Sequence, residues 1–322
     1  MRIVQIIVGL ACAVFFLSLA LYRAPLEAVG TTIVNANPLW IGAAMSVYAV
    51  NMSLRIWRWQ IILHPVAPIS YSNVARALIV GYGLNTILPA RLGELFRAEF
   101  VKINLGLSRA STLSSIVVER LFDGLMVVGC LGLGLLLATR QDTAALVNVL
   151  VIASALFGLI LFAALCLARP GKSGSFVRSP RLSAQLMMVR QAFHIVRTRR
   201  IVAVALLTLI IYVPDTLSLW LIVKAAGLQL GPSDTLVLVG AASLSTLLPS
   251  GPAFLGPLQF AYAVAIEFAG GPGAVGIAAA TLVQLCILLP VALVAVGILV
   301  HEAPSVLYTA SATRSPDVRQ AG

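Results

Sequence analysis

The chain has 322 residues, of which 60% are hydrophobic and only 10% are charged. Soluble domains carry about 25% charged residues, so this composition excludes an ordinary soluble protein and predicts that lipid surrounds much of the surface. The net charge of +11 does not indicate a nucleic-acid partner, because eight of the 22 basic residues lie in one polar loop, Arg169–Arg200, which holds no acidic residue. Such a loop is typical of the cytoplasmic side of a membrane protein, where it also suits anionic headgroups.

In chain order, six apolar segments are long enough to span a bilayer as helices, which takes about 20 residues. The first is longer than the roughly 7–15 apolar residues of a signal peptide, which favours a retained helix over a cleaved signal. The six predicted spans are Ile3–Tyr22, Pro38–Leu54, Ser111–Ala138, Thr143–Ala168, Ile201–Val223 and Ala274–Val300. They predict an all-α polytopic membrane protein forming one domain, with a first half over 3–168, a basic loop over 169–200, a second half over 201–301 and a polar tail over 302–322.

Two further segments, Ser72–Asn104 and Asp234–Phe268, are interrupted by proline and glycine. The uncharged run Ala77–Ala90 has 14 residues, about 21 Å as a helix against a hydrocarbon core of about 30 Å. Thr246, Leu248 and Pro249 stand 160 residues after Thr86, Leu88 and Pro89. We therefore predict two re-entrant hairpins, with corners at Pro89 and Gly93 in the first and at Pro249, Gly251, Pro252 and Gly256 in the second. Eight plain spans, two of them short, are the alternative.

The distribution of basic residues predicts the orientation. It places the Arg169–Arg200 loop, Arg55 and Arg58 after the second span, and both termini on the cytoplasmic side of the inner membrane. The segments Arg23–Asn37 and Lys224–Asp234 are expected outside. The first hairpin then begins and ends inside, while the second begins and ends outside. The two halves would be related by an axis in the membrane plane, which is an inverted repeat with the two corners facing each other across a cavity.

Few ionisable residues lie at membrane depth, so each one is a candidate functional residue. Two groups stand out, one on the first hairpin and one on the third span. In the first, the charged residues are three apart and share a helix face if helical, and in the second Glu119 and Asp123 are four apart and also share a face. With the polar Asn85 they form the predicted set for binding a lipid headgroup: Asn85, Arg91, Glu94, Arg97, Glu119, Arg120 and Asp123. The alternative role is a buried ion-pair network that pins the hairpin, and the two roles are compatible because carboxylates can orient a guanidinium that then meets a phosphate.

The second hairpin has no charge from Thr235 to Ile266 and offers only hydroxyl and backbone N–H groups. Asp215, beside Pro214, is a candidate counter-ion or proton-coupling carboxylate, and equally a cap for a helix that the proline breaks. The three histidines and four cysteines show no metal-ligand spacing, and no hydrolase or phosphate-loop motif occurs. We expect no metal, no cofactor and no enzymatic activity.

The tract Asn85-x-x-Leu88-Pro89-x-Arg91-x-Gly93-Glu94-x-x-Arg97, followed by Val118-Glu119-Arg120-Leu121-x-Asp123, resembles the bacterial and archaeal family that contains the transmembrane region of lysylphosphatidylglycerol synthase. That family includes flippase-like proteins and a branch associated with hopanoid biosynthesis. Leu248-Pro249-x-x-Pro252-x-x-Leu255-Gly256 looks like its later motif, although Pro257 stands where the family more often has a small or apolar residue. The resemblance spans nearly the whole chain and implies the lipid-translocating part without the synthase domain.

The favoured expectation is a flippase-like translocator of an anionic or phosphate-bearing lipid. A small-solute secondary transporter is a second reading, although it would need a more polar lining. A third is a non-transporting component of a lipid or hopanoid biosynthesis assembly. The expected partners are membrane lipids, and both a homo-oligomer and proteins of lipid biosynthesis remain open as further partners.

Overall fold

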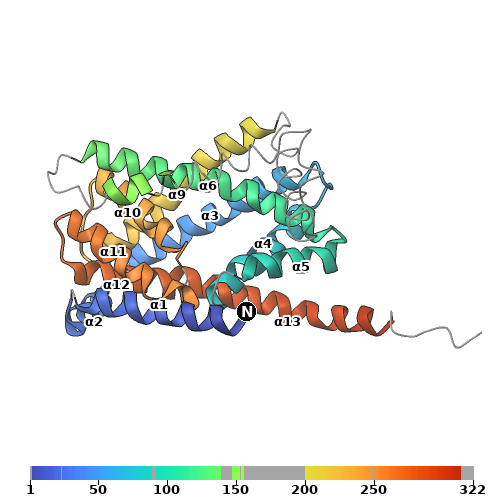
Figure 1. Cartoon of the computed structure of the whole chain (residues 1–322), viewed down its shortest axis with the longest axis horizontal. Helices are drawn as coiled ribbons and strands as arrows, with labels where there is room; N and C mark the ends of the chain where they lie inside the picture. The colour runs from blue at the N-terminus through green and yellow to red at the C-terminus, as the bar shows by residue number, and fades with distance from the viewer. Residues whose placement is uncertain are drawn as a thin grey trace, which may run out of the picture.

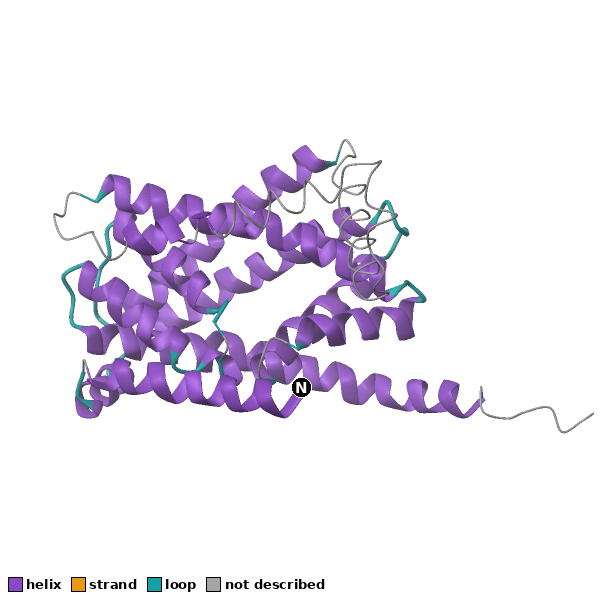
Figure 2. Cartoon of the chain, viewed as in Figure 1, coloured by secondary structure: helices purple, strands orange, loops and turns teal. Residues whose placement is uncertain are grey.

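The computed structural model describes residues 2–22, 24–88, 92–138, 147–152, 154–155, 200–248 and 250–312, with side chains from 9 to 302 within those ranges. In this part of the chain the regular elements are all helical (Figure 2). They are α1 (Arg2–Tyr22), α2 (Leu26–Val34), α3 (Pro38–Leu63), α4 (Tyr71–Ile87), α5 (Gly93–Leu105), α6 (Arg109–Leu137), α9 (Ile201–Ala225), α10 (Pro232–Ser245), the 3-10 turn η2 (Pro252–Phe254), α11 (Pro257–Phe268), α12 (Gly273–Val283), the π-helical turn η3 (Gln284–Leu288) and α13 (Leu289–Ala312).

Among the described residues, four stretches of helix are long and apolar enough to cross a membrane: Pro38–Leu63, Arg109–Leu137, Ile201–Ala225 and Gly273–Glu302. A fifth is added if α1 and α2, which meet at a bend of 87°, count as one span. The chain is therefore a multi-pass α-helical protein, as its composition predicts. Most of the predicted fourth span, Thr143–Ala168, and the Arg169–Arg200 loop as far as residue 199 lie outside the described residues.

The prediction that the second span ends at Leu54 is wrong, because α3 continues to Leu63. The extra turns bury Ile56, Trp59 and Ile62 on one face. Arg55 and Arg58 are thus inside the helix rather than in a cytoplasmic loop. They are tolerated there because partners from other helices compensate their charges.

The segment 23–37, expected to be an external loop, contains α2. Its N-cap residue is Pro25, and Val29 packs with Ala274 and Ile277 of α12. The next helix, α3, starts at a well-formed cap, since the Asn37 side chain accepts a hydrogen bond from the Leu39 N–H at 2.9 Å.

The two segments predicted to be hairpins are each formed by two short helices that pack against each other, α4 with α5 and α10 with α11. These four helices have 17, 13, 14 and 12 residues, so each is shorter than the roughly 20 residues that a span needs. In Figure 1 the α10–α11 pair lies toward the left of the helix bundle and the α4–α5 pair toward its right, while α13 extends further to the right.

Helices α3 and α9 lie side by side and run in opposite directions. The Asn37 N–H donates to the Ala225 carbonyl at 2.9 Å, the Ser218 hydroxyl to the Ala44 carbonyl at 3.1 Å, and the Asn51 amide to the Ile211 carbonyl at 2.8 Å. As the residue number rises along α3, the partner's number falls along α9. The pair therefore packs antiparallel over most of its length.

The first arm of each hairpin packs against the long helix that follows the other hairpin, α4 on α13 and α10 on α6. Glycine allows the close approach at both interfaces. A Cβ added at Gly83 of α4 would overlap the methyl group of Ala295, and one at Gly240 of α10 would lie 2.6 Å from the Cβ of Leu131.

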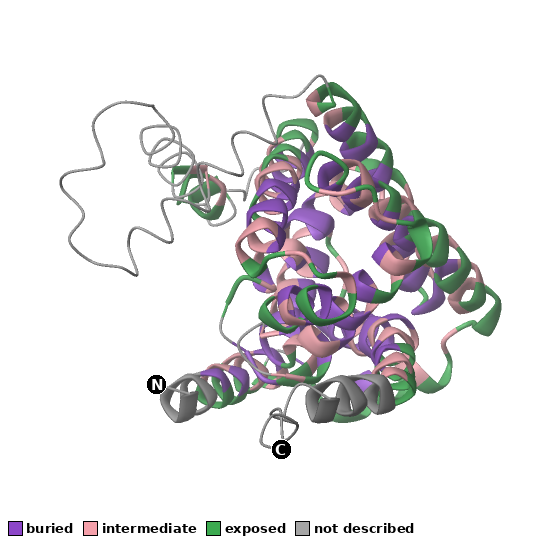
Figure 3. Ribbon diagram, turned by 90° about the vertical axis from the view of Figure 1, so that its right-hand side faces the viewer, coloured by how far each residue is buried: buried purple, intermediate pink, exposed green. Residues whose placement is uncertain are grey.

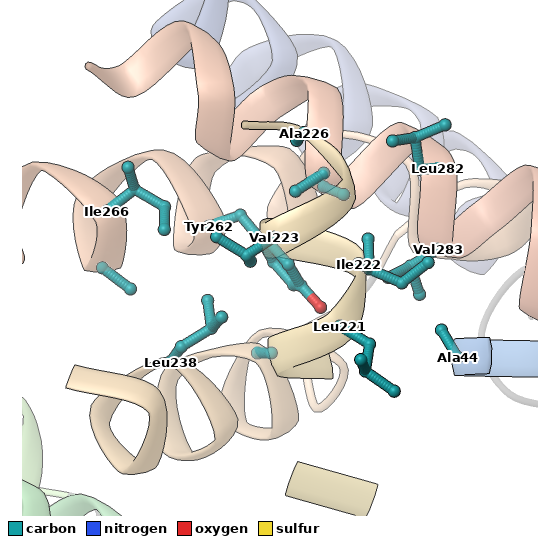
Figure 4. Close-up of a cluster of buried hydrophobic side chains, with 14 of the residues drawn as sticks. Ala44, Leu221, Ile222, Val223, Ala226, Leu238, Tyr262, Ile266, Leu282 and Val283 are labelled. Carbon is teal, nitrogen blue, oxygen red and sulfur yellow. The ribbon is translucent and has the colours of Figure 1, made fainter. Parts of the chain in front are cut away.

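Seen along the long axis, buried residues face the interior of the helix bundle and exposed residues face outward (Figure 3). Many of the outward side chains are large and apolar, for example Leu136 at 85% and Val213 at 67% exposure. In a soluble protein such a surface would be unfavourable, whereas lipid solvates it. The largest apolar cluster joins α9 to both arms of the second hairpin and to α12, and its members Tyr262, Ile222 and Leu238 are fully buried (Figure 4).

Candidate functional site: a buried charge network

Eight ionisable side chains from α3, α5, α6 and α9 are joined by ion pairs, and we call this set the charge network. Its members are Arg55, Arg58, Glu94, Arg97, Glu119, Arg120, Asp123 and Asp215. Four arginines face four carboxylates, so the formal charge of the set is zero. Glu119 and Asp123 lie near the middle of α6, and Asp215 near the middle of α9. The network therefore lies at membrane depth, where uncompensated charge is costly.

Glu119 is the innermost acid, with no solvent exposure. Its Oε1 accepts a hydrogen bond from the Tyr82 hydroxyl at 2.8 Å and lies 3.5 Å from Nη2 of Arg58. Its Oε2 accepts from Nη1 of Arg97 at 3.1 Å. One carboxylate thus holds together α3, α4, α5 and α6.

Asp123 lies one helical turn further along α6 and shares Arg58 with Glu119. Its Oδ1 accepts from Nη1 of Arg58 at 2.6 Å, while its Oδ2 lies 3.6 Å from Arg120 and 3.9 Å from Arg55. The Tyr212 hydroxyl of α9 donates to the backbone carbonyl of Asp123 at 3.0 Å. This acid connects the first half of the chain to α9.

Arg55 extends the network to the second half. Its Nη2 lies 3.3 Å from Oδ1 of Asp215, and its Nε donates to the Asn51 side chain at 2.6 Å. Asp215 stands 160 residues after Arg55, the same offset that relates the two hairpin motifs. The carboxylate predicted to be a counter-ion is therefore part of the same network as the first-hairpin charges.

Glu94 and Arg120 form the accessible edge of the network. Nε of Arg120 lies 3.0 Å from Oε1 of Glu94, and their side chains are 34% and 27% exposed. By contrast, the Arg58 and Arg97 side chains are almost completely buried. A ligand reaching the network would meet this edge pair first.

Arg97 is buried to 1% exposure but uses few of its donors. Its guanidinium carbon lies 3.4 Å from the ring centroid of Trp59, which is a close cation–π contact. Nη1 bonds Glu119, whereas Nε and Nη2 have no hydrogen-bond partner among the described residues. The Nε–Nη2 edge is one of those through which arginine binds an oxyanion with two parallel hydrogen bonds.

Glycine positions Arg97 and the first corner. A Cβ at Gly81 of α4 would lie 2.9 Å from Cδ of Arg97, so this glycine makes room for the buried arginine. A Cβ at Gly93 would overlap the Gly81 carbonyl and lie 2.7 Å from Oδ1 of Asn85. That oxygen is buried and has no hydrogen-bond partner within the described part of the chain. Gly93 thus lets the start of α5 lie directly on the α4 backbone.

The corner of the second hairpin is held by two glutamines. The Gln284 amide donates to the Ala253 carbonyl at 2.9 Å, and the Gln259 amide donates to Oε1 of Gln284 at 2.7 Å. The Gly256 N–H donates to Oε1 of Gln259 at 2.9 Å. We call these contacts the amide bridge. Ala253 and Phe254, at φ values of 54° and 60°, occupy the left-handed region, which is unfavourable for residues other than glycine.

The two hairpins therefore differ in what fixes them. Removing one partner of a buried ion pair costs about 3–5 kcal/mol, because a buried charge is left unpaired. A neutral hydrogen bond contributes only about 1 kcal/mol net.

The second hairpin is expected to offer hydroxyl groups. Those of Ser245 and Thr246 donate to carbonyls of their own helix, at 2.7 Å each.

The structure brings five of the predicted headgroup residues into one network: Glu94, Arg97, Glu119, Arg120 and Asp123. Arg91 lies outside the described residues, as do the corner residues Pro89 and Pro249. Sequence reasoning missed Arg55 and Arg58, together with Tyr82 and Trp59. The sequence held a signal for the longer helix, because past Leu54 apolar residues continue three and four apart around the two arginines. Within the described residues, no group of three or more His, Cys, Asp or Glu side chains is arranged to hold a metal.

The fold and this site define a multi-pass α-helical membrane protein with a charge-balanced polar network inside its helix bundle. A family model described as lysylphosphatidylglycerol synthase TM region matches residues 6–295. The chain belongs to this family, as the motifs indicate.

Similarity to a curated protein is confined to part of the chain. The protein named Glycosyltransferase AglD, from Haloferax volcanii, is 32% identical over 133 residues, which cover 41% of this chain and 21% of that protein. The match thus involves about a fifth of the relative's length. No solved structure matches the chain.

Proposed function

We propose that the protein is a flippase-like translocator that moves an anionic or phosphate-bearing lipid across the cytoplasmic membrane. The observation that carries this proposal is the unpaired edge of Arg97. A fully buried guanidinium with two unused donor atoms is unfavourable unless a ligand completes it at some stage. A phosphate oxygen pair fits the Nε–Nη2 edge, and the Trp59 ring holds the guanidinium plane in place.

The balance of the network suits transient binding. Without ligand, four arginines and four carboxylates cancel, so the site is stable when empty. A headgroup phosphate would enter at the Glu94–Arg120 edge, and Arg97 would then hold it, with Arg91 as a further donor on the same hairpin. The acyl chains would stay in lipid while only the headgroup crosses the interior.

The helix packing supports an inverted repeat as the transport scaffold. An axis in the membrane plane would make equivalent helices antiparallel, and α3 and α9 are antiparallel with Asn51 bonded to the residue 160 positions later. The same axis would exchange the α4–α13 interface with the α10–α6 interface, and both are present. The two helix pairs, toward the left and toward the right of the bundle in Figure 1, would then be re-entrant hairpins from opposite sides.

The test is lipid scrambling in proteoliposomes, with fluorescently labelled phosphatidylglycerol and dithionite quenching. Arg97→Gln is expected to slow scrambling by about tenfold or more, since a lost hydrogen bond to a charged group costs roughly 1.5–3 kcal/mol. Arg97→Lys keeps the charge but loses the fork, so it is expected to restore only part of the rate. The matched control is Arg109→Gln, which removes an arginine paired with the exposed Glu99 outside the network.

Scrambling of labelled phosphatidylglycerol at the wild-type rate by folded Arg97→Gln would contradict the proposal. Equal scrambling of a labelled neutral glycolipid by the wild type would contradict the preference for phosphate. The control variant is expected to match the wild type in both assays, which separates loss of the site from loss of any arginine.

The similarity to a protein named as a glycosyltransferase favours a second candidate function. Here the chain would be a membrane component that acts beside a glycosyl-transfer reaction without moving lipid itself. Under this alternative, purified protein would not scramble any labelled lipid, while the Arg97 variants would still lose binding of the phosphate-bearing lipid in vesicles.

A further inference from the structure

In each half of the chain a buried side-chain contact joins the second arm of the hairpin to the helix that follows, and the two contacts differ in chemistry. In the first half, Arg97 on the second arm pairs with Glu119 on α6. In the second half, Gln259 on the second arm pairs with Gln284, at the junction of α12 and α13. Both pairs are buried. One is ionic and part of a larger network, whereas the other is neutral and has only backbone groups as further partners.

The neutral pair holds the corner of the second hairpin in a strained backbone conformation. Ala253 and Phe254 adopt left-handed backbone conformations, and Gln284 fixes the Ala253 carbonyl in that geometry. Gln284 itself opens a single π-helical turn, a departure from α-helical geometry that is common at functional sites. Strained backbone persists only where its surroundings hold it. The backbone at the corner would therefore relax to a more favourable conformation if the glutamine contacts were lost.

The corner of the second hairpin lies between two other helices, so its opening would affect both. On one side η2 packs against α4, the helix that contributes Tyr82 to the charge network. On the other side the corner lies on α1, since a Cβ at Gly256 would overlap the Ala13 carbonyl and one at Gly251 would lie 3.3 Å from the Ala13 methyl. Residues 250–256 thus form a wedge between α1 and α4.

We propose that residues 250–256 are a gate and that the Gln259–Gln284 amide bridge is the latch that keeps it closed, while the first hairpin stays fixed by its ion pairs. Neutral amide contacts can exchange with water or with a polar headgroup without stranding a charge, so this corner opens more readily than the first hairpin. Opening would bare the α4 side of the charge network. Only this last consequence rests on the proposed function.

Hydrogen exchange measured by mass spectrometry in lipid nanodiscs tests the latch without requiring transport. Gln284→Leu keeps the approximate size and removes the amide. It is expected to speed backbone exchange in residues 250–256 by about fivefold or more, with exchange in α5, which the ion pairs hold, unchanged. Gln259→Leu should act in the same direction and provides a second variant if the first does not fold. The matched control is Gln60→Leu, because Gln60 also donates to a backbone carbonyl, that of Ile69, but lies away from the corner.

A variant that relieves the strained backbone is expected to slow hydrogen exchange at the corner. Ala253→Gly relieves the left-handed conformation and leaves both glutamines in place, so exchange at the corner should slow by about twofold or more. Unchanged corner exchange in both glutamine variants would overturn the gate. So would a rise of equal size in α5, which would show that the bridge only supports the global fold, and so would faster corner exchange in Ala253→Gly.

The exchange result and the scrambling result are separable. If the glutamine variants open the corner while Arg97→Gln scrambles normally, the gate stands and the proposed headgroup role of Arg97 falls. If Arg97→Gln abolishes scrambling while the glutamine variants leave hydrogen exchange at the corner unchanged, the headgroup role is supported and the gate is refuted.

Discussion

Glu119 offers the sharpest test of the charge network as a structural unit. It is fully buried and accepts a hydrogen bond from Tyr82, pairs with Arg97 at 3.1 Å, and approaches Arg58 at 3.5 Å. Replacing it by alanine has unequal effects on its partners. Arg58 keeps Asp123 at 2.6 Å, whereas Arg97 loses its carboxylate.

The expected magnitude follows from that difference. One stranded buried arginine costs about 3–5 kcal/mol, and the hydrogen bond lost by Tyr82 adds roughly 1–2 kcal/mol. Because the terms share one site and are not additive, we expect Glu119→Ala to lower the free energy of unfolding by about 4–6 kcal/mol. Adding Arg97→Ala removes the stranded charge, so the double variant should be about 3 kcal/mol more stable than the sum of the single effects implies.

The assay is reversible unfolding in mixed micelles, induced by titration with SDS. It is carried out on the wild type, both single variants and the double variant. The control cycle uses Glu99→Ala and Arg109→Ala, an exposed pair for which solvent screening predicts only a weak coupling. A coupling between residues 97 and 119 no larger than that of the exposed pair would refute the reasoning that burial makes this network cohesive.

Three further outcomes are expected. Gly240→Leu should disrupt the α10–α6 interface and reduce the yield of folded protein on size-exclusion chromatography, whereas Gly129→Leu should be tolerated because nothing lies within 4 Å of its added Cβ. In a background without native cysteines, a cysteine at Gln229 should react with an impermeant reagent from outside intact cells and one at Ser175 should not; the reverse pattern would overturn the predicted orientation. Arg91→Ala should abolish scrambling and Arg91→Lys should restore it poorly, while full activity of the lysine variant would mean that charge alone matters there.

Much of the architecture is predictable from the sequence because the bilayer imposes simple length and polarity rules. Apolar runs of spanning length predict the helices now seen as α6 and α9 to within a few residues. Proline and glycine predict where the two short helix pairs are broken. The i, i+3 spacing places Glu94 and Arg97 on one face of α5, and the i, i+4 spacing places Glu119 and Asp123 on one face of α6.

The same rules misjudge the end of α3. A pair of arginines after an apolar run resembles a cytoplasmic boundary, so the charge bias predicts that Arg55 and Arg58 lie in a loop. Whether such a residue ends a helix or lies within it depends on its partners. Here the deciding contacts come from Asp123 and Asp215, which are remote in the chain.

What only the tertiary structure decided are contacts between side chains that share no helix and no sequence period. The stacking of Arg97 on Trp59, which leaves one edge of the guanidinium unpaired, is one such contact. The Gln259–Gln284 amide bridge is another. Hydrophobic length and charge bias act on one segment at a time, so they determine which helices form. The free energy of a buried polar group depends on the atoms that other segments place within 3–4 Å of it, so its role is decided only when the helices pack.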